Sequence, residues 1–402
     1  MELTVLDDIE TKLLTLESKL RVVETESMDI ARSAGRILAQ EVLNFRDSPP
    51  MDVSAMDGYA CRLEDLQVCA SRLPVDQTAT AGAAPLELSG HRAIRIFTGA
   101  VVPKGANVVI PRERCDEKTD RVAIQMPLDQ IKLGWNIRRQ AENARQGDVA
   151  LSAGCRIDGP RISSLVSMHQ HPQILVHRKV RVAIINTGDE LLDIGMPIQP
   201  WQIRDSNGPL LECTLQALPW TQWTRTSVKD DLPKIQSAIE QALQDSDAII
   251  LTGGVSMGDT DHVPTAVQNA GGKIVFHRLP IRPGAPILAA ASDHGQLILG
   301  LPGNPVSVAV TFRRYGLPLL EHLAGKIDRP ACYRTELANS DEKTLHLVWF
   351  RLVKIQPDST ALLLPSQGSG DLRSLGLSDG FIEVPPQTPS KGSFRYYQWS
   401  PS

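Results

Sequence analysis

Three segments of the chain place glycines, carboxylates or helix-capping residues directly after an apolar run. They are residues 186–191 after the run 181–185, residues 252–261 after 248–251, and residues 301–307 after 296–300. Ligands of an open parallel sheet bind beyond the carboxyl ends of its strands, so segments that follow strands are where chemistry is expected. If the three runs are strands of one sheet, we expect the three segments to converge on one edge of it.

The first two segments carry carboxylates. Asp189 and Glu190 stand where the first strand ends, although a capped helix start with acids in its first turn explains them equally well. In the second segment the glycines permit close backbone approach to an anion and the acids can bind Mg²⁺, whereas the alternative is a plain glycine-rich turn. The glycines are Gly253 and Gly254, and the acids are Asp259 and Asp261.

The third segment resembles the start of a helix. Asn304 is placed to cap it and Pro305 suits its first position, so the helix would present backbone amides to a phosphate. Arg278 and Arg282, nearby in the chain, supply two cations able to fork onto phosphate or oxyanion oxygens, and two solvated arginines are the alternative. Each signal is weak alone, but their convergence on one edge favours a nucleotide-phosphate and metal site.

The elements that must position these segments repeat between residues 179 and 326. Near-continuous apolar strands at 182–185, 248–251 and 297–299 alternate with helices such as 210–218. Such strands are typical of a parallel sheet covered on both faces. We therefore predict a central, doubly wound, mostly parallel α/β domain that begins near residue 178.

The rest of the chain consists mainly of short β-runs between turn residues. A small β domain is predicted from 51 to about 136, and a small β-barrel or sandwich from about 328 to the end. The expected strands are 36–39, 93–97, 108–110, 345–350 and 380–384, and the expected helices are 27–35 and 159–169.

Length and composition limit the class of protein. The 402 residues suffice for about two to four domains, and a net charge of −4 leaves no overall basic field for nucleic acid or an anionic membrane. The six cysteines have no C-x-x-C spacing, which fits reduced thiols in a cytosolic protein. The first residues have neither a basic nor a continuous apolar stretch, and no window approaches the ~20 apolar residues of a membrane span. We expect a cytoplasmic protein that binds neither nucleic acid nor membranes.

Six segments resemble, in order, motifs of the MoeA/gephyrin E-domain family of molybdopterin molybdenumtransferases, over nearly the whole chain. They are S-A-M-D-G-Y-A at 54–60, F-T-G-A-V-V-P-K-G-A at 97–106, T-G-D-E-L at 187–191, D-S-N at 205–207, G-G-V-S-M-G-D-T-D at 253–261 and L-P-G-N-P-V-S at 301–307. In the final domain, Phe350-Arg351 and Q-G-S-G at 367–370 match more loosely, at positions that the resemblance places near the neighbouring subunit's ligand.

The resemblance implies a four-domain fold and an elongated homodimer with a site between subunits. The implied domains are a discontinuous N-terminal domain (1–50 with 138–178), an inserted small β domain (51–137), an α/β molybdopterin-binding domain (179–327) and a C-terminal β-barrel (328–402).

It also implies an activity: proteins similar to this one take adenylylated molybdopterin and molybdate, release AMP, and leave molybdenum on the pterin dithiolate with the help of Mg²⁺. The catalytic residues would be Asp57, Thr98, Glu190, Asp259 and Asp261. Asp189, Glu190, Asp259 and Asp261 would hold the metal. The substrate-binding residues would be Ser54, Asp205, Asn207, Gly253, Gly254, Ser256, Arg278, Arg282, Pro302, Gly303, Asn304, Pro305, Arg351 and Ser369. The molybdopterin adenylyltransferase is a further candidate partner.

The chain departs from the family pattern at three places. A-E-N at 141–143 replaces G-E-D, R-P-G-A-P at 282–286 replaces K-P-G-K-P, and Val53 replaces an asparagine. A carboxylate and a lysine are thereby lost. This leaves a second possible function, a molybdopterin-binding or scaffolding paralogue, although the intact catalytic carboxylates argue against it. A third reading, the sister adenylyltransferase, would carry a T-G-G-T-G loop in a single-domain chain; Gly254-Val255-Ser256 and the extra domains argue against that.

Overall fold

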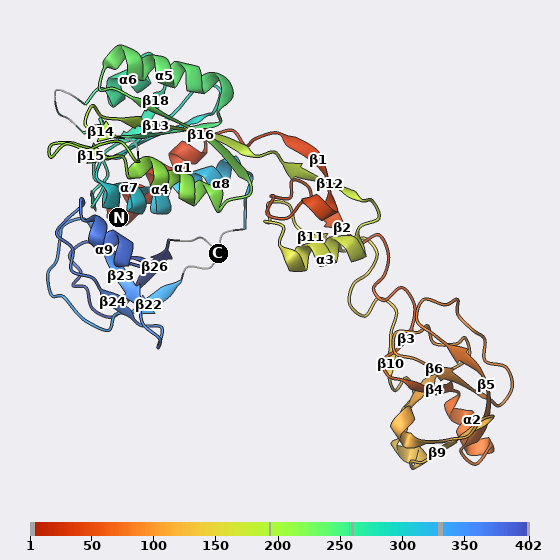
Figure 1. The fold of residues 1–402 in the computed structure, drawn as a ribbon. Helices are drawn as coiled ribbons and strands as arrows, with labels where there is room; N and C mark the ends of the chain where they lie inside the picture. The colour runs from red at the N-terminus through yellow and green to blue at the C-terminus, as the bar shows by residue number, and fades with distance from the viewer. Residues whose placement is uncertain (1–4, 193, 257, 259–260, 329–332, 400–402) are drawn as a thin grey trace. The chain divides into compact units, whose positions relative to one another are not determined.

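The computed structural model describes residues 5–192, 194–256, 258, 261–328 and 333–399 (Figure 1). The chain divides into two compact units, each with its own apolar core. The first comprises Met1–Gln40, Ala153–Ile162 and Gln173–Ser402, and the second comprises Glu41–Ser152 and Ser163–Pro172. The finer division into four domains stays a prediction.

The first unit is built on a six-stranded sheet. Its order is β16 (Thr221–Val228), β13 (Val180–Thr187), β17 (Ala248–Thr252), β21 (Leu297–Leu301), β20 (Leu288–Ala291) and β18 (Lys273–His277). The first four strands are parallel, whereas β20 is antiparallel to both of its neighbours. All residues of β17 and β21 are buried, as expected of strands with both faces covered. The predicted mostly parallel sheet is confirmed.

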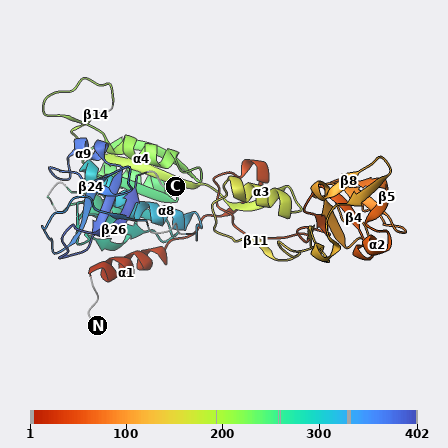
Figure 2. The same cartoon turned by 90° about the horizontal axis from the view of Figure 1, so that it is seen from below.

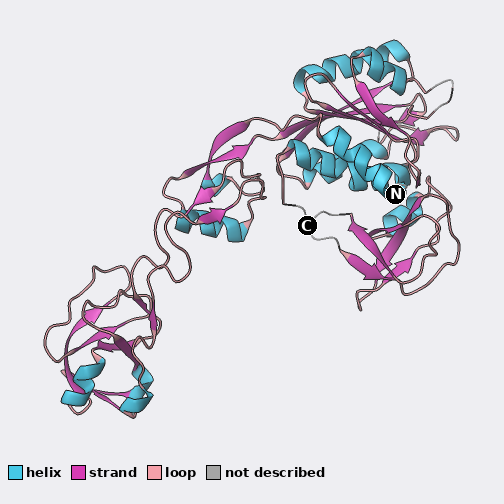
Figure 3. Ribbon diagram, turned by 180° about the vertical axis from the view of Figure 1, so that it is seen from behind, coloured by secondary structure: helices cyan, strands magenta, loops and turns pink. Residues whose placement is uncertain are grey.

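Helices cover both faces of this sheet (Figure 3). One face packs against α1 (Val5–Glu17), α4 (Asn207–Gln216), α7 (Pro305–Thr311) and α8 (Leu317–Leu323), and the other against α5 (Leu232–Asp245) and α6 (Val263–Asn269). Helix α1 was not expected from the sequence; it buries Ile9, Leu13 and Leu16, whose spacing places them on one helical face.

A second sheet of the same unit contains most of the C-terminal strands. Its order is β19 (Ile281–Arg282), β23 (Val348–Ile355), β25 (Gly380–Val384), β26 (Ser393–Gln398) and β22 (Arg334–Glu336), with β24 (Ala361–Leu363) on β23 and the short helix α9 (Leu372–Leu377) nearby. Because β19 lies in sequence between β18 and β20, it ties the two sheets together. The strand expected at 345–350 instead begins at Val348 and continues to Ile355.

The helix expected at 27–35 does not form. Instead, the segments of chain before and after the second unit pair as a two-stranded ribbon. Strand β1 (Thr25–Asp29) pairs with β12 (Gln173–His177), so only a single 3₁₀ turn, Ile30–Arg32, remains helical. The strand expected at 36–39 is reduced to isolated bridges at Ile37 and Leu38. Helix α3 (Gly159–Met168) agrees with the prediction.

The second unit is a small β domain, as predicted. Its sheet has the order β7 (Val108–Pro111), β4 (Gly58–Cys61), β6 (Ala93–Ile96), β5 (Arg72–Ala79), β9 (Arg121–Ile124) and β8 (Cys115–Glu117), with the short helix α2 (Leu63–Val68). Two short ribbons complete it: β2 (Val42–Leu43) with β11 (Val149–Leu151), and β3 (Val53–Ser54) with β10 (Ile137–Arg138). No helix among the described residues of either unit is long and apolar enough to cross a membrane.

Candidate functional site

The three glycine- and acid-bearing segments follow neighbouring parallel strands. The strand ends are in register, since Asn186 of β13 pairs with Thr252 of β17 and Thr252 pairs with Leu301 of β21. The segments therefore start side by side at one edge of the sheet. We call this edge, with residues 187–190, 253–256, 261 and 302–304, the rim.

The second and third segments of the rim are in direct contact. Gly253 donates its backbone N–H to Leu301 O at 3.1 Å, and it adopts a φ of +91°. A methyl group on Gly253 would lie 2.6 Å from Thr187 O, and one on Gly303 would lie 3.6 Å from the α-carbon of Gly253. Only glycine fits at 253, because both the backbone conformation and the neighbouring carbonyl exclude a side chain.

The start of helix α4 is bonded to the third segment. Asn207 is buried, and its Nδ2 donates to Gly303 O at 2.7 Å. Asp205 fixes this turn: its Oδ1 accepts from the backbone N–H groups of Asn207 and Gly208 at 3.0 Å, and its Oδ2 accepts from Arg225 at 3.0 Å. Both oxygens of Asp205 are thus engaged within the protein, while Asn207 borders the rim directly.

The C-terminal part of the first unit contributes Ser369. Asn304 occupies the cap position of α7 and Pro305 its first helical position, as expected, but the Asn304 side chain makes no capping bond. Its Nδ2 donates instead to Ser369 Oγ at 2.9 Å, and Val306 N donates to Ser369 O at 3.0 Å. The loop carrying Ser369 is therefore fastened to the rim, next to Pro302, which is buried.

Asp371 holds this C-terminal loop in shape. It accepts hydrogen bonds from Ser374 Oγ and N at 2.6 and 3.0 Å and from Gln367 N at 3.0 Å. These bonds, led by that of the Ser374 side chain, lower the pKa of Asp371 to about 2. An ionised Asp371 therefore fixes the turn that presents Ser369.

The acids of the rim are solvent-accessible. Asp189 and Glu190 are exposed, and Asp261 Oδ2 accepts from Gly258 N at 2.7 Å. Ser256 is exposed on the second segment. Asp259, the remaining predicted acid, lies outside the described residues.

A further carboxylate near the rim, Asp230, was not predicted from the sequence. It follows β16, whose Val228 pairs with Thr187, so a fourth strand of the sheet ends at the same edge. Burial raises the pKa of Asp230, and the nearby carboxylates of Glu190 and Asp189 raise it further. Its Oδ1 is buried without a hydrogen-bond partner among the described residues.

The second unit brings Ser54, Asp57 and Thr98 together. Asp57 Oδ1 accepts from both the backbone N–H and the hydroxyl of Thr98 at 2.7 Å, and these bonds lower the pKa of Asp57. Ser54 donates its hydroxyl to Met56 O at 2.6 Å, and Gly99 N donates to Ser54 O at 2.9 Å. An exposed, ionised carboxylate is thus presented by the turn before β4.

The three predicted arginines are not bonded to the rim within the described parts of the chain. Arg278 and Arg282 are exposed on the segment between β18 and β20. Arg351, on β23, pairs with Asp341 at 2.8 Å, donates to Ser390 at 2.9 Å and lies over the Trp349 ring. Arg351 is therefore held by residues of the C-terminal part of the chain.

Asn143, one of the departures from the family pattern, has a structural partner. Its Oδ1 accepts from Arg138 at 2.7 Å, while Glu142 accepts from Arg139 N at 2.9 Å. Ala141, where the family pattern has glycine, adopts a φ of +60°, a conformation that side chains disfavour.

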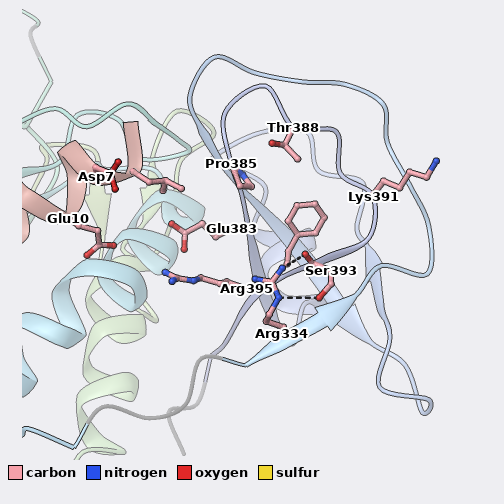
Figure 4. Close-up of a pocket in the computed structure, with 11 residues that line it drawn as sticks. Asp7, Glu10, Arg334, Glu383, Pro385, Thr388, Lys391, Ser393 and Arg395 are labelled. Atoms are coloured by element: carbon pink, nitrogen blue, oxygen red, sulfur yellow. Dashed lines mark hydrogen bonds between the residues drawn. The ribbon is translucent and has the colours of Figure 1, made fainter. Parts of the chain in front are cut away.

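A separate hollow of about 500 Å³ lies between α1 and the C-terminal sheet (Figure 4). Glu10 of α1 and Glu383 of β25 line it, and Glu383 accepts from Arg314 at 3.3 Å and from the Tyr397 hydroxyl at 2.6 Å. None of the rim residues lines this hollow, so it is distinct from the candidate site.

Comparison with known proteins gives matches along most of the chain. Residues 6–168 match the family model of the MoeA N-terminal region (domains I and II), 183–322 that of a probable molybdopterin binding domain, and 335–393 that of the MoeA C-terminal region (domain IV). A molybdopterin molybdenumtransferase of Nostoc sp. is 37% identical over 309 residues, covering 75% of this chain and 70% of that protein. One of Synechococcus elongatus is 33% identical over 384 residues, covering 93% and 94%.

A solved structure agrees with the fold. The crystal structure of a molybdopterin biosynthesis MoeA protein from Pyrococcus horikoshii OT3 superimposes with a TM-score of 0.81 at 25% identity, covering 96% of this chain and 99% of that one. The resemblance inferred from the motifs, and the multidomain α/β and β architecture expected with it, are confirmed.

Proposed function

Because the chain belongs to the MoeA family, we propose that it is a molybdopterin molybdenumtransferase of molybdenum cofactor biosynthesis. It transfers molybdenum from molybdate to adenylylated molybdopterin and releases AMP. The observation that carries this proposal is the rim, where segments after three parallel strands start side by side. The second and third of these segments are bonded to each other, and the third is bonded to Asn207 and Ser369. Such an edge is where α/β sheets bind nucleotides.

The phosphates of the substrate would meet the glycines of the rim. Gly253, Gly254 and Gly303 carry no side chain that would keep an anion from their backbone, and the hydroxyls of Ser256 and Ser369 can donate to phosphate oxygens. Arg278, Arg282 and Arg351 would neutralise molybdate or phosphate charge. The thiolates of the substrate, as soft ligands, then hold molybdenum.

Mg²⁺ is the proposed cofactor. The described residues contain no group of three or more His, Cys, Asp or Glu side chains in ligating geometry. The donor set nevertheless fits Mg²⁺, which commonly uses one or two carboxylates together with substrate phosphates. Asp230 adds a further carboxyl group beside Asp189 and Glu190, and its buried Oδ1 has no hydrogen-bond partner among the described residues. Asp189, Glu190 and Asp261, with Asp259, would hold the ion. When bound, it would offset charge that develops on the phosphate oxygens.

Asp57 and Thr98 are proposed as catalytic residues of the second unit. The two bonds from Thr98 keep the Asp57 carboxylate ionised and oriented, so it can accept a proton from a reacting oxygen. We also propose that the protein acts in the cytoplasm as a homodimer, which sedimentation of the purified protein would test. Contact with the molybdopterin adenylyltransferase, which would supply the substrate, is part of the same proposal.

The test incubates the purified protein with adenylylated molybdopterin, Mg²⁺ and molybdate. Release of AMP, followed by reconstitution of a molybdenum-free apoenzyme, is the expected result. Tight binding of the substrate without AMP release would reject the transferase and favour the scaffolding reading. An Asp261→Asn variant should bind the substrate but release AMP at least about tenfold more slowly, since a rim carboxylate is lost.

A further inference from the structure

Five large apolar side chains are exposed within ten residues directly after the first segment of the rim. They are Ile194, Met196, Ile198, Trp201 and Ile203, which we call the apolar loop. Trp201 and Ile194 are each 76% exposed. No other ten-residue stretch of the described chain exposes as many, and concentrated exposed apolar surface is characteristic of a binding site.

The apolar loop continues directly from the rim and is closed at its base. Short strands β14 (Leu191–Leu192) and β15 (Ile203–Arg204) pair with each other and close the loop at its base. Ile203 N donates to Glu190 O at 3.2 Å, and Asp205 N donates to Leu192 O at 2.9 Å. The loop thus leaves the rim after Glu190 and ends at Asp205, two residues before Asn207, whose side chain donates to Gly303 O of the rim.

The loop is also braced internally. Arg204 donates from its guanidinium to Met196 O at 2.9 Å, Gln202 N donates to Gln199 O at 3.0 Å, and Gln199 N donates to Gln202 Oε1 at 3.1 Å. Figure 2 shows it standing out from the body of its unit beside the β14 label. A braced loop can keep exposed side chains in one place next to the rim.

We propose that the apolar loop is the ring-binding wall of the site and that Trp201 stacks on a flat bicyclic heterocycle of the substrate. The proposal rests on the proposed function, because adenylylated molybdopterin carries two such rings, adenine and pterin, on either side of its phosphates. With the phosphates at the glycines of the rim, one ring extends past Glu190 toward the loop. Indole faces stack on heterocyclic bases through dispersion and apolar burial. Trp201 is then a substrate-positioning residue.

A substrate fits this surface better than a protein partner does. The backbone bond from Ile203 to Glu190, and the bond from Asn207 to Gly303 just after the loop, fix the loop to the same edge that would hold the phosphates. The exposed group combines one aromatic face with flexible aliphatic neighbours, which suits a flat ring attached to a charged group.

The test measures binding by calorimetry, with Mg²⁺ present, for three probes: AMP, neopterin monophosphate and ribose 5-phosphate. Trp201→Ala should weaken the binding of at least one of the ring-bearing probes about tenfold and leave ribose 5-phosphate unchanged, and Trp201→Phe should restore most of the loss. The ring-bearing probe that responds identifies which ring stacks. Equal weakening of all three probes, no weakening, or no binding of either ring-bearing probe by the unaltered protein would overturn the proposal.

Turnover separates this proposal from the proposed function. In the AMP-release assay, Trp201→Ala should raise KM about tenfold with kcat within about twofold, because stacking holds the substrate without touching the reacting bond. Leu14→Ala, which removes an exposed apolar side chain of α1, is the matched control and should change neither. AMP release that is indifferent to Trp201 would refute the stacking role and leave the transferase standing. Trp201-dependent binding of AMP without any turnover would do the reverse.

Discussion

Asn207 Nδ2 donates a hydrogen bond of 2.7 Å to Gly303 O, across 96 residues of sequence. This bond fastens the start of α4 to the segment after β21, while Asn207 itself is held by Asp205. Because the bond joins the buried Asn207 to a residue of the rim, it links the fold around the six-stranded sheet to the geometry of the candidate site.

Removing this bond should impair the site more than the fold. We expect Asn207→Ala to reduce kcat/KM for AMP release about tenfold or more, because the Gly303 carbonyl loses its donor and the third segment can shift. Gln216→Ala, at the exposed far end of the same helix, should leave the rate unchanged. Equal rates for the two variants in the AMP-release assay would show that Asn207 has no role in the site.

Gly253 should tolerate no side chain. Gly253→Ala combines the strain of a φ of +91° with a methyl group 2.6 Å from Thr187 O. We therefore expect the free energy of unfolding to fall by about 1–3 kcal/mol and kcat/KM to fall at least about tenfold. Gly271→Ala is the matched control: its φ is +85° and a methyl group would meet no atom within 4 Å. In this control the free energy of unfolding, measured by urea denaturation, should fall by only about 1 kcal/mol, and the activity should be unchanged.

The residues that follow the central parallel strands could be predicted from the sequence, whereas the other residues near the rim could not. Asp189, Gly253 and Gly303 follow apolar runs. The near-continuous apolar composition of these runs predicts strands that are buried on both faces. Asp230 was missed because its strand β16 is at the edge of the sheet and alternates exposed and covered residues, so no apolar run precedes it. A test for alternating patterns between predicted helices would have found it.

Long-range pairing explains the other errors. The region 27–35 has local helix signals, yet β1 is fixed as a strand by β12, nearly 150 residues later. Asn304 is at its expected cap position, but its side chain donates to Ser369, 65 residues later in the chain, a partner that no local pattern specifies.

The Thr98 hydroxyl should control the ionisation of Asp57. We expect Thr98→Val to raise the pKa of Asp57, while the remaining bond from the Thr98 backbone N–H keeps it from returning fully to its usual value. A lowered folded-state pKa stabilises the protein above the unfolded-state value, and this contribution is lost as pH falls through the folded-state pKa. The stability difference between the two proteins should therefore be largest near neutral pH and shrink in acid.

Carbon-13 NMR of the Asp57 carboxyl would measure the pKa directly, and thermal unfolding across the acid range would measure the stability. Titration curves that coincide in the two proteins would show that the Thr98 hydroxyl does not act on Asp57.

Ala141 should be improved by glycine. Its φ of +60° strains an alanine but not a glycine, so we expect Ala141→Gly to stabilise the second unit by up to about 1 kcal/mol. Ala144→Gly, in the same loop but at a residue without positive φ, should destabilise it by about 0.5–1 kcal/mol. Thermal unfolding followed by circular dichroism measures both changes in stability. A lower Tm for Ala141→Gly would contradict the claim that Ala141 is strained.

The most direct test of a metal and nucleotide site at the rim is anomalous diffraction from crystals soaked with AMP and with Mn²⁺ as a substitute for Mg²⁺. We expect a manganese peak about 2 Å from a carboxylate oxygen of Asp189, Glu190 or Asp261, with the AMP phosphate against Gly253 or Gly303. Manganese and AMP bound away from the segments after β13, β17 and β21 would contradict it.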